Sequence, residues 1–192
     1  MDRKEIDELR KEASIAFKKS DFERALSLSE KLAEENVPAA YYTCGLILEK
    51  GWLNGKKDLD RALEFYRKLA INWNADEGYL GCVRIILGKR QIDQRDKAIQ
   101  YCLGATKGPS KRWAFILVGR IYEELYDPPQ YKLARKAYLK SFSLGSAWAL
   151  RQYARSLMKS RNFVGGVLIH IATTVISPFM VLFGGTQTVR RG

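Results

Sequence analysis

The sequence has few of the residues from which catalytic and metal sites are built. Its 192 residues include one histidine, His170, and three well-separated cysteines, Cys44, Cys82 and Cys102, with no CxxC pair. An odd number of isolated cysteines indicates neither a disulfide framework nor a zinc site, and we expect buried, reduced thiols. Because a nucleophile needs a base beside it and no glycine-rich phosphate loop follows a strand pattern, the sequence predicts no enzyme activity and no cofactor or metal.

Acidic residues are missing from the last third of the chain. All 21 Asp and Glu lie at or before Asp127, whereas ten of the 33 Lys and Arg follow it, within a formal net charge of +12. A nucleic-acid-binding domain more often has a basic stripe across its fold, interleaved with exposed aromatic residues. The excess charge instead lies beside the most apolar segment, which favours a membrane boundary and no nucleic-acid partner.

An internal repeat dominates the rest of the sequence. Ala62, Ala98 and Ala134 each lie near the start of an amphipathic segment, and they are 36 residues apart. A glycine at matching phase precedes each one, at Gly45, Gly81 and Gly119. We expect each glycine to let the two helices of a hairpin approach closely at the alanine, and stacked hairpins to bury their apolar faces.

The repeat sets the predicted domain organisation, which is all-α. We expect a helical-repeat solenoid over residues 1–160, followed by a membrane anchor at 161–187 and a short tail at 188–192. The predicted αα-hairpins cover 3–36, 38–72, 75–107 and 112–144, and a closing helix covers 146–159.

The repeat motif resembles that of a known family. AYYTCGLILEKG from Ala40, followed by RALEFYRKLA from Arg61, is similar to the Sel-one-like repeat (SLR), a branch of the tetratricopeptide (TPR) superfamily. AFILVGRIYEEL from Ala114 is a second copy, whereas the third repeat departs at Asp76, Arg84 and Leu87. The resemblance covers about residues 38–158. It implies a non-enzymatic protein–protein adaptor, often one that serves envelope or membrane-complex assembly.

If the hairpins stack as tetratricopeptides do, the first helix of each hairpin lines a groove. Its predicted lining residues are Tyr42, Leu46, Glu49, Trp113, Ile116, Arg120 and Glu123. Mixed aromatic and charged side chains suit an extended peptide or a partner helix. Alternatively, Tyr42 and Trp113 are packed between repeats.

The C-terminal segment predicts a single membrane-spanning helix. Residues 163–185 contain no Asp, Glu, Lys or Arg among 23 positions, enough for a helix about as long as a bilayer core is thick. The alternatives are a buried core helix and an amphipathic segment docked on the solenoid. Four basic residues precede the segment and could face lipid headgroups, or form a solvated helix face: Arg151, Arg155, Lys159 and Arg161.

Two features fix the predicted direction and contacts of the anchor. The larger basic cluster before the span, and an N-terminus without a signal peptide, place the repeats in the cytosol. Small and polar residues recur on one side of the span, at Gly166, His170, Thr173, Thr174 and Ser177. Such a side lets another helix pack in the membrane, either a partner's or that of a second copy.

We therefore expect a membrane-tethered adaptor that binds protein partners of a membrane complex. Envelope polysaccharide synthesis or export at a bacterial inner membrane is the setting that the family resemblance implies. Two alternatives stay open: a tail-anchored adaptor of the mitochondrial outer membrane, and an accessory subunit of a transport complex that uses His170.

Overall fold

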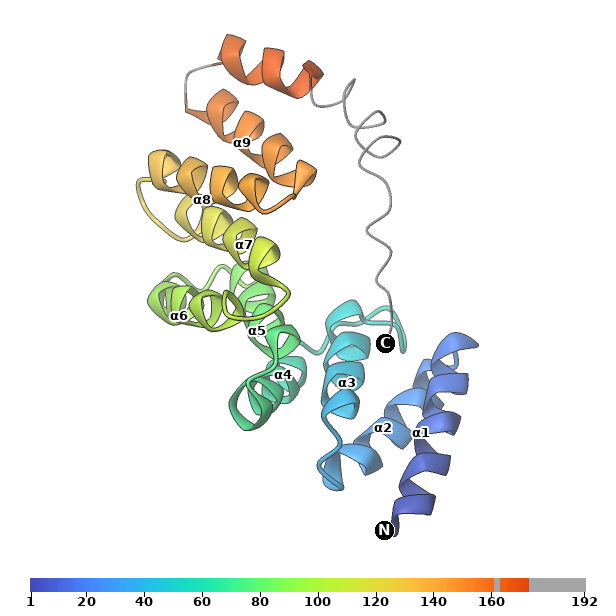
Figure 1. Cartoon of the computed structure of the whole chain (residues 1–192). Coiled ribbons are helices and arrows are strands. Elements are labelled where there is room, and N and C mark those ends of the chain that lie inside the picture. The colour runs from blue at the N-terminus through green and yellow to red at the C-terminus, as the bar shows by residue number, and fades with distance from the viewer. Residues whose placement is uncertain (161–162, 173–192) are drawn as a thin grey trace. The chain divides into compact units, whose positions relative to one another are not determined.

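The computed structural model describes residues 1–160 and 163–172, and the elements found there are all helical, with no strand (Figure 1). Their bounds are α1 (Arg3–Lys18), α2 (Phe22–Glu34), α3 (Pro38–Lys50), α4 (Leu59–Trp73), α5 (Asp76–Gly88), the 3₁₀ turn η1 (Ile92–Gln94), α6 (Arg95–Ala105), α7 (Lys111–Glu124), α8 (Tyr131–Ser143) and α9 (Ala147–Lys159). A further helical stretch covers 163–172. The chain divides into two compact units, Met1–Ser110 and Lys111–Gly192.

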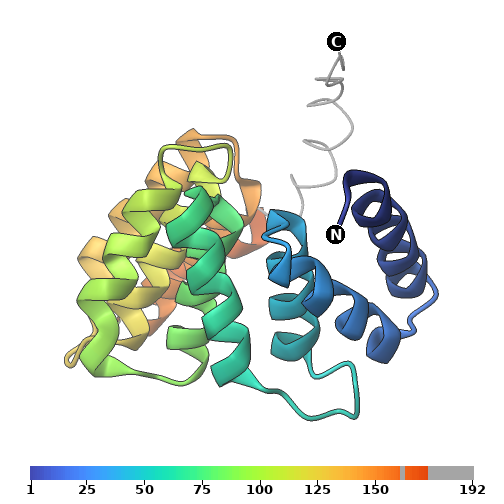
Figure 2. The ribbon, with the colours of Figure 1, turned by 90° about the horizontal axis from the view of Figure 1, so that it is seen from below.

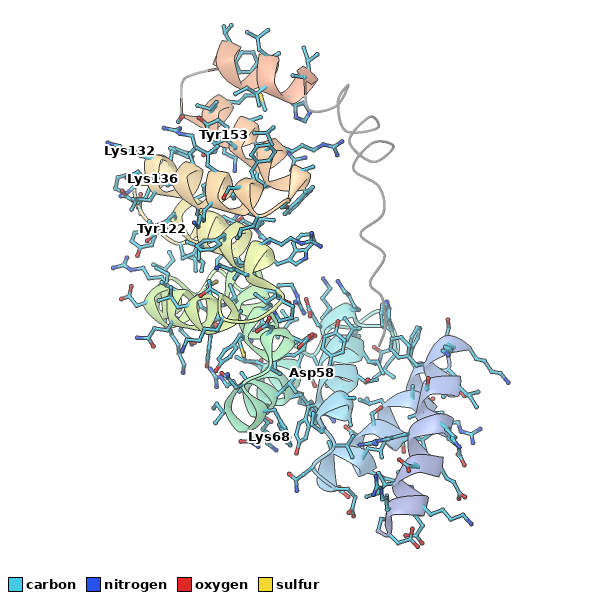
Figure 3. The ribbon with its side chains drawn as sticks, in the orientation of Figure 1. Asp58, Lys68, Tyr122, Lys132, Lys136 and Tyr153 are labelled. Carbon is cyan, nitrogen blue, oxygen red and sulfur yellow. The ribbon has the colours of Figure 1, made fainter. Side chains whose placement is uncertain are left out.

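Short polar residues start several of these helices. The Asp2 carboxylate accepts a hydrogen bond from the Glu5 backbone N–H at 2.8 Å, and the Glu5 carboxylate accepts one from the Asp2 backbone N–H, which completes a capping box. Asp21 caps α2 through the Arg24 N–H at 3.2 Å. Asp58, labelled in Figure 3, caps α4 through the Arg61 N–H at 3.1 Å. Each carboxylate satisfies a donor that the first helical turn leaves unpaired.

Consecutive helices of the first unit pack on one another, so that α2 lies between α1 and α3 (Figure 2). The repeat alanines Ala62 and Ala98 are fully buried, as is Ala25 at the equivalent place in α2. In the second unit, α8 packs on both α7 and α9, and Ala134 is also fully buried. The alanines therefore mark the close helix contacts, as the repeat predicts.

The glycines of the repeat lie directly against aromatic rings. A Cβ built on Gly45 would lie 2.8 Å from the ring of Tyr66, and one on Gly81 would overlap the other side of the same ring. Gly119 has the same relation to Tyr138. The tyrosine, one turn after the repeat alanine, therefore fills the space beside these glycines.

The loop between α3 and α4 is held by an aromatic cluster. Gly51 ends α3 in the left-handed region at φ 69°, where a Cβ would also press on the Lys56 backbone. The next residue, Trp52, stacks on Phe22 with ring centroids 4.7 Å apart and meets Phe17 edge-on at 5.7 Å. The loop thus connects the first two hairpins of the first unit.

The 163–172 helix contacts α9 within the second unit. A Cβ on Gly166 would lie 2.8 Å from the Ala154 carbonyl oxygen and 2.9 Å from the Met158 backbone nitrogen. Across 1–160 and 163–172, no helix reaches the combination of length and hydropathy that a membrane crossing needs. The rest of the predicted anchor, 161–162 and 173–187, and the tail at 188–192 lie outside the described residues.

Candidate functional site

A partly buried polar network connects three helices of the first unit. The Glu49 carboxylate on α3 accepts two hydrogen bonds from Arg84 on α5, one from Nε at 2.9 Å and one from Nη2 at 2.7 Å. The Tyr66 hydroxyl on α4 donates to the same carboxylate at 2.8 Å, and Arg84 Nη2 donates to that hydroxyl at 3.2 Å. Only 12% of the Glu49 side chain is exposed. The fork-shaped guanidinium matches the carboxylate, so the network fixes both distance and register between α3 and α5.

The electrostatics of the network follow from burial and from this pairing. Burial raises the pKa of the Tyr66 hydroxyl, and the neighbouring Glu49 charge raises it further. Burial alone would raise the pKa of Glu49, but the hydrogen bonds and positive charge of Arg84 outweigh it and hold that pKa below its usual value. Glu49 is therefore a paired carboxylate, and nothing in this arrangement prepares it to act as a general base.

A related arrangement recurs in the second unit. Glu123, at the position in α7 that Glu49 has in α3, accepts a hydrogen bond from Lys159 Nζ on α9 at 3.0 Å, and 7% of its side chain is exposed. Tyr138 on α8 matches Tyr66, and burial together with the Glu123 charge raises its pKa. Tyr122 and Tyr153 pack against the same core (Figure 3). Two of the predicted groove carboxylates thus hold neighbouring helices together.

The remaining predicted groove residues lie in different environments. Tyr42 and Leu46 are half-buried, and the Tyr42 ring lies 6.3 Å from that of Tyr66. Ile116 is 1% exposed inside the core of the second unit, so it offers no surface to a partner. Arg120 forms two hydrogen bonds with Glu124, at 2.8 and 3.1 Å, which raise its pKa.

Trp113 is the predicted groove residue with the most exposed side chain. It is 45% exposed and lies 5.9 Å from Trp148, which is 41% exposed. The two rings extend from the first turns of α7 and α9, each one residue before a buried alanine, Ala114 or Ala149. Trp148 was not among the predicted residues, although this shared position could have revealed it.

A crevice lies between the first three helices of the first unit. Its volume is about 360 Å³, and the side chains that line it are mostly small or apolar. They include Ser14 and Phe17 of α1, and Ala39 and Thr43 of α3. The positive side chains of Arg10 and Lys18 also belong to the lining. A crevice of this size can accept one or two apolar side chains of a partner.

The residues predicted at the membrane divide between described and undescribed parts of the chain. On α9, Arg155 is exposed, Arg151 is half-buried, and Lys159 is the partner of Glu123. Gly166 packs on α9 and His170 is half-buried. Arg161, Thr173, Thr174 and Ser177 lie outside the described residues.

The three thiols are buried inside the first unit. Burial raises the pKa of Cys44, Cys82 and Cys102 to about 12 each, which suppresses the reactive thiolate. Among residues 1–160 and 163–172, no three His, Cys, Asp or Glu side chains lie close enough to hold a metal ion.

Comparisons with solved structures identify the fold. A MamA fragment from Desulfovibrio magneticus RS-1 superposes with a TM-score of 0.72 at 15% identity, covering 92% of this chain and 97% of that one. A second MamA structure gives a TM-score of 0.68 at 15% identity, covering 95% and 97%. A Sel1 repeat protein from Oxalobacter formigenes gives 0.61 at 15% identity, covering 91% and 76%. No protein-family model and no curated protein matches the sequence.

These likenesses, together with the all-helical elements, show a TPR/Sel1-like repeat fold. The predicted repeat fold is thereby confirmed.

Proposed function

We propose that the chain is a non-enzymatic scaffold that binds protein partners through its repeats and is attached to a membrane through its C-terminal segment. The observation that carries the first part is the tryptophan pair Trp113–Trp148. Two large aromatic rings 5.9 Å apart, each more than two-fifths exposed, form an apolar patch that the fold leaves uncovered. Tryptophan is the residue type most enriched among those that dominate binding energy at protein interfaces.

Charge supports a partner with an acidic surface. Lys132 and Lys136 extend from α8 (Figure 3), and after Asp127 the sequence has ten Lys and Arg but no Asp or Glu. Opposite charge speeds association and discriminates against basic partners. The crevice of the first unit supplies a second place where apolar side chains of a partner can insert.

The test is a photo-crosslinking amino acid placed at Trp148, followed by affinity measurements with the protein that it captures. We expect Trp113→Ala/Trp148→Ala to weaken binding by about 30-fold or more, because loss of one such anchor costs about 2 kcal/mol. The matched control is Leu139→Ala/Phe142→Ala, which removes two side chains of the same unit that are 45% and 37% exposed. Equal affinities for the two double variants would refute the assignment.

Membrane attachment rests on the uncharged run 163–185 and the cations before it. The excess of those cations favours repeats on the cytosolic side, and a bacterial inner membrane is the setting we propose. A complex of envelope polysaccharide synthesis or export fits the Sel-one-like resemblance. The anchor can also pair with a second copy. Recovery of the chain in the soluble fraction would contradict the attachment.

A further inference from the structure

The 163–172 helix has two unlike faces. Gly166 brings one face against the backbone of α9, at Ala154 and Met158. The other face consists of large apolar side chains exposed by 55–70%, namely Phe163, Val164, Leu168 and Ile171. Their spacing places them within one side of a helix. An apolar face of this kind on a protein surface marks a binding surface.

The surroundings of this face carry positive charge. The neighbouring helix α9 contains Arg151 and Arg155 and no acidic residue, and its Lys159 is paired with Glu123 on α7. The uncharged sequence continues beyond Ile171 to residue 185. An apolar face next to cations, continuous with an uncharged run, matches the chemistry of an anionic bilayer surface.

We propose that the 163–172 helix lies in the plane of the membrane interface, with Phe163, Val164, Leu168 and Ile171 in contact with the acyl chains of anionic lipids. This inference rests on the proposed membrane attachment and specifies its geometry. If the helix instead entered the bilayer along the membrane normal, α9 packed beside it would carry its cations into the hydrocarbon, which is costly. The in-plane orientation keeps these cations at the depth of the headgroups.

The two orientations predict different depths along the helix. We would place a nitroxide label on the full-length chain at Val164→Cys, Leu168→Cys and Ile171→Cys in turn. Label depths would be measured by power saturation in phosphatidylcholine vesicles with and without phosphatidylglycerol. Because the native thiols Cys44, Cys82 and Cys102 are all 0% exposed, labelling will be confined to the introduced cysteine.

The in-plane orientation predicts that the three labels lie at the same depth in the bilayer, to within about 5 Å, the pitch of one helical turn. A helix along the membrane normal predicts a difference of about 10 Å between positions 164 and 171, from a rise of ~1.5 Å per residue. We also expect at least tenfold stronger association with the vesicles that contain phosphatidylglycerol.

Three results would overturn the inference, and they are distinguishable. Staggered depths would refute the in-plane orientation and leave membrane attachment intact. Absence of vesicle binding would refute both proposals. Labels that are immobilised without vesicles, in a chain that elutes as a dimer, would show that a second copy covers this face.

Discussion

Replacing Arg84 by leucine tests whether the Glu49–Tyr66–Arg84 network stabilises the stack of helices in the first unit. The substitution leaves the Glu49 carboxylate, with 12% of its side chain exposed, without its cationic partner. Breaking a fully buried ion pair costs about 3–5 kcal/mol. Because 33% of the Arg84 side chain is in contact with solvent, we expect a smaller loss of about 2–3 kcal/mol in the free energy of unfolding.

The assay is urea unfolding followed by far-ultraviolet circular dichroism, together with hydrogen exchange resolved by peptide. Exchange should accelerate in α3, α4 and α5, whose side chains form the network, and stay unchanged in α7–α9 of the other compact unit. The control is Arg24→Leu, because Arg24 and Glu12 form an exposed pair at 3.2 Å, with side chains 63% and 53% exposed. Removing such a pair should cost less than about 1 kcal/mol.

The pH dependence gives an independent check of the same network. The folded-state pKa of Glu49 is lowered, so its contribution to stability is present above the unfolded-state pKa of about 4.3. It is lost as pH falls through the lower folded-state pKa. The stability difference between the unmodified chain and Arg84→Leu should therefore be greatest near neutral pH and shrink in acid. Equal losses for Arg84→Leu and Arg24→Leu, or a difference that does not change with pH, would refute the reasoning.

Two further predictions concern packing and thiol reactivity. In urea unfolding, Gly81→Ala should lower the free energy of unfolding by about 1–3 kcal/mol, because the new methyl group overlaps the Tyr66 ring. The control is Gly88→Ala in the same helix. Its methyl group meets nothing within 4 Å, so the substitution should be neutral or stabilising. The three native thiols, each fully buried with a pKa near 12, should react with a thiol reagent at pH 8 only after denaturation; rapid labelling of the folded chain would contradict their burial.

The sequence predicts the helices better than it predicts their side-chain contacts. The all-helical repeat fold is confirmed, and the N-caps Asp21 and Asp58 are of a residue type that local capping rules favour. Those features depend on short-range geometry and on a repeated alanine. Arg84 stood out in the sequence only as a departure from the motif, because its partner Glu49 is 35 residues away. Which side chain faces it depends on the packing of α3, α4 and α5 together.

The candidate surfaces show the same limit. The helical phase that placed Trp113 on an accessible face also placed Ile116 there, yet Ile116 is 1% exposed because α8 packs over it with Tyr138. Gly166 was interpreted as a contact for a membrane partner, and in the structure it contacts α9. Composition could not distinguish these two uses of a small residue, because both require close approach of another helix.

Two equivalent positions in the helical repeats differ in polarity from one repeat to the next. Where the second and fourth repeats have Glu49 with Tyr66 and Glu123 with Tyr138, the first has Phe17 with Ser29 and the third has Ile85 with Cys102. A chimera that exchanged the second and third hairpins would therefore take Glu49 on α3 away from Arg84 on α5, and would leave the Glu123–Lys159 pair between α7 and α9 in place. The hairpins are consequently not interchangeable modules. These side chains help to specify the order in which the hairpins stack, because another order would lose their contacts.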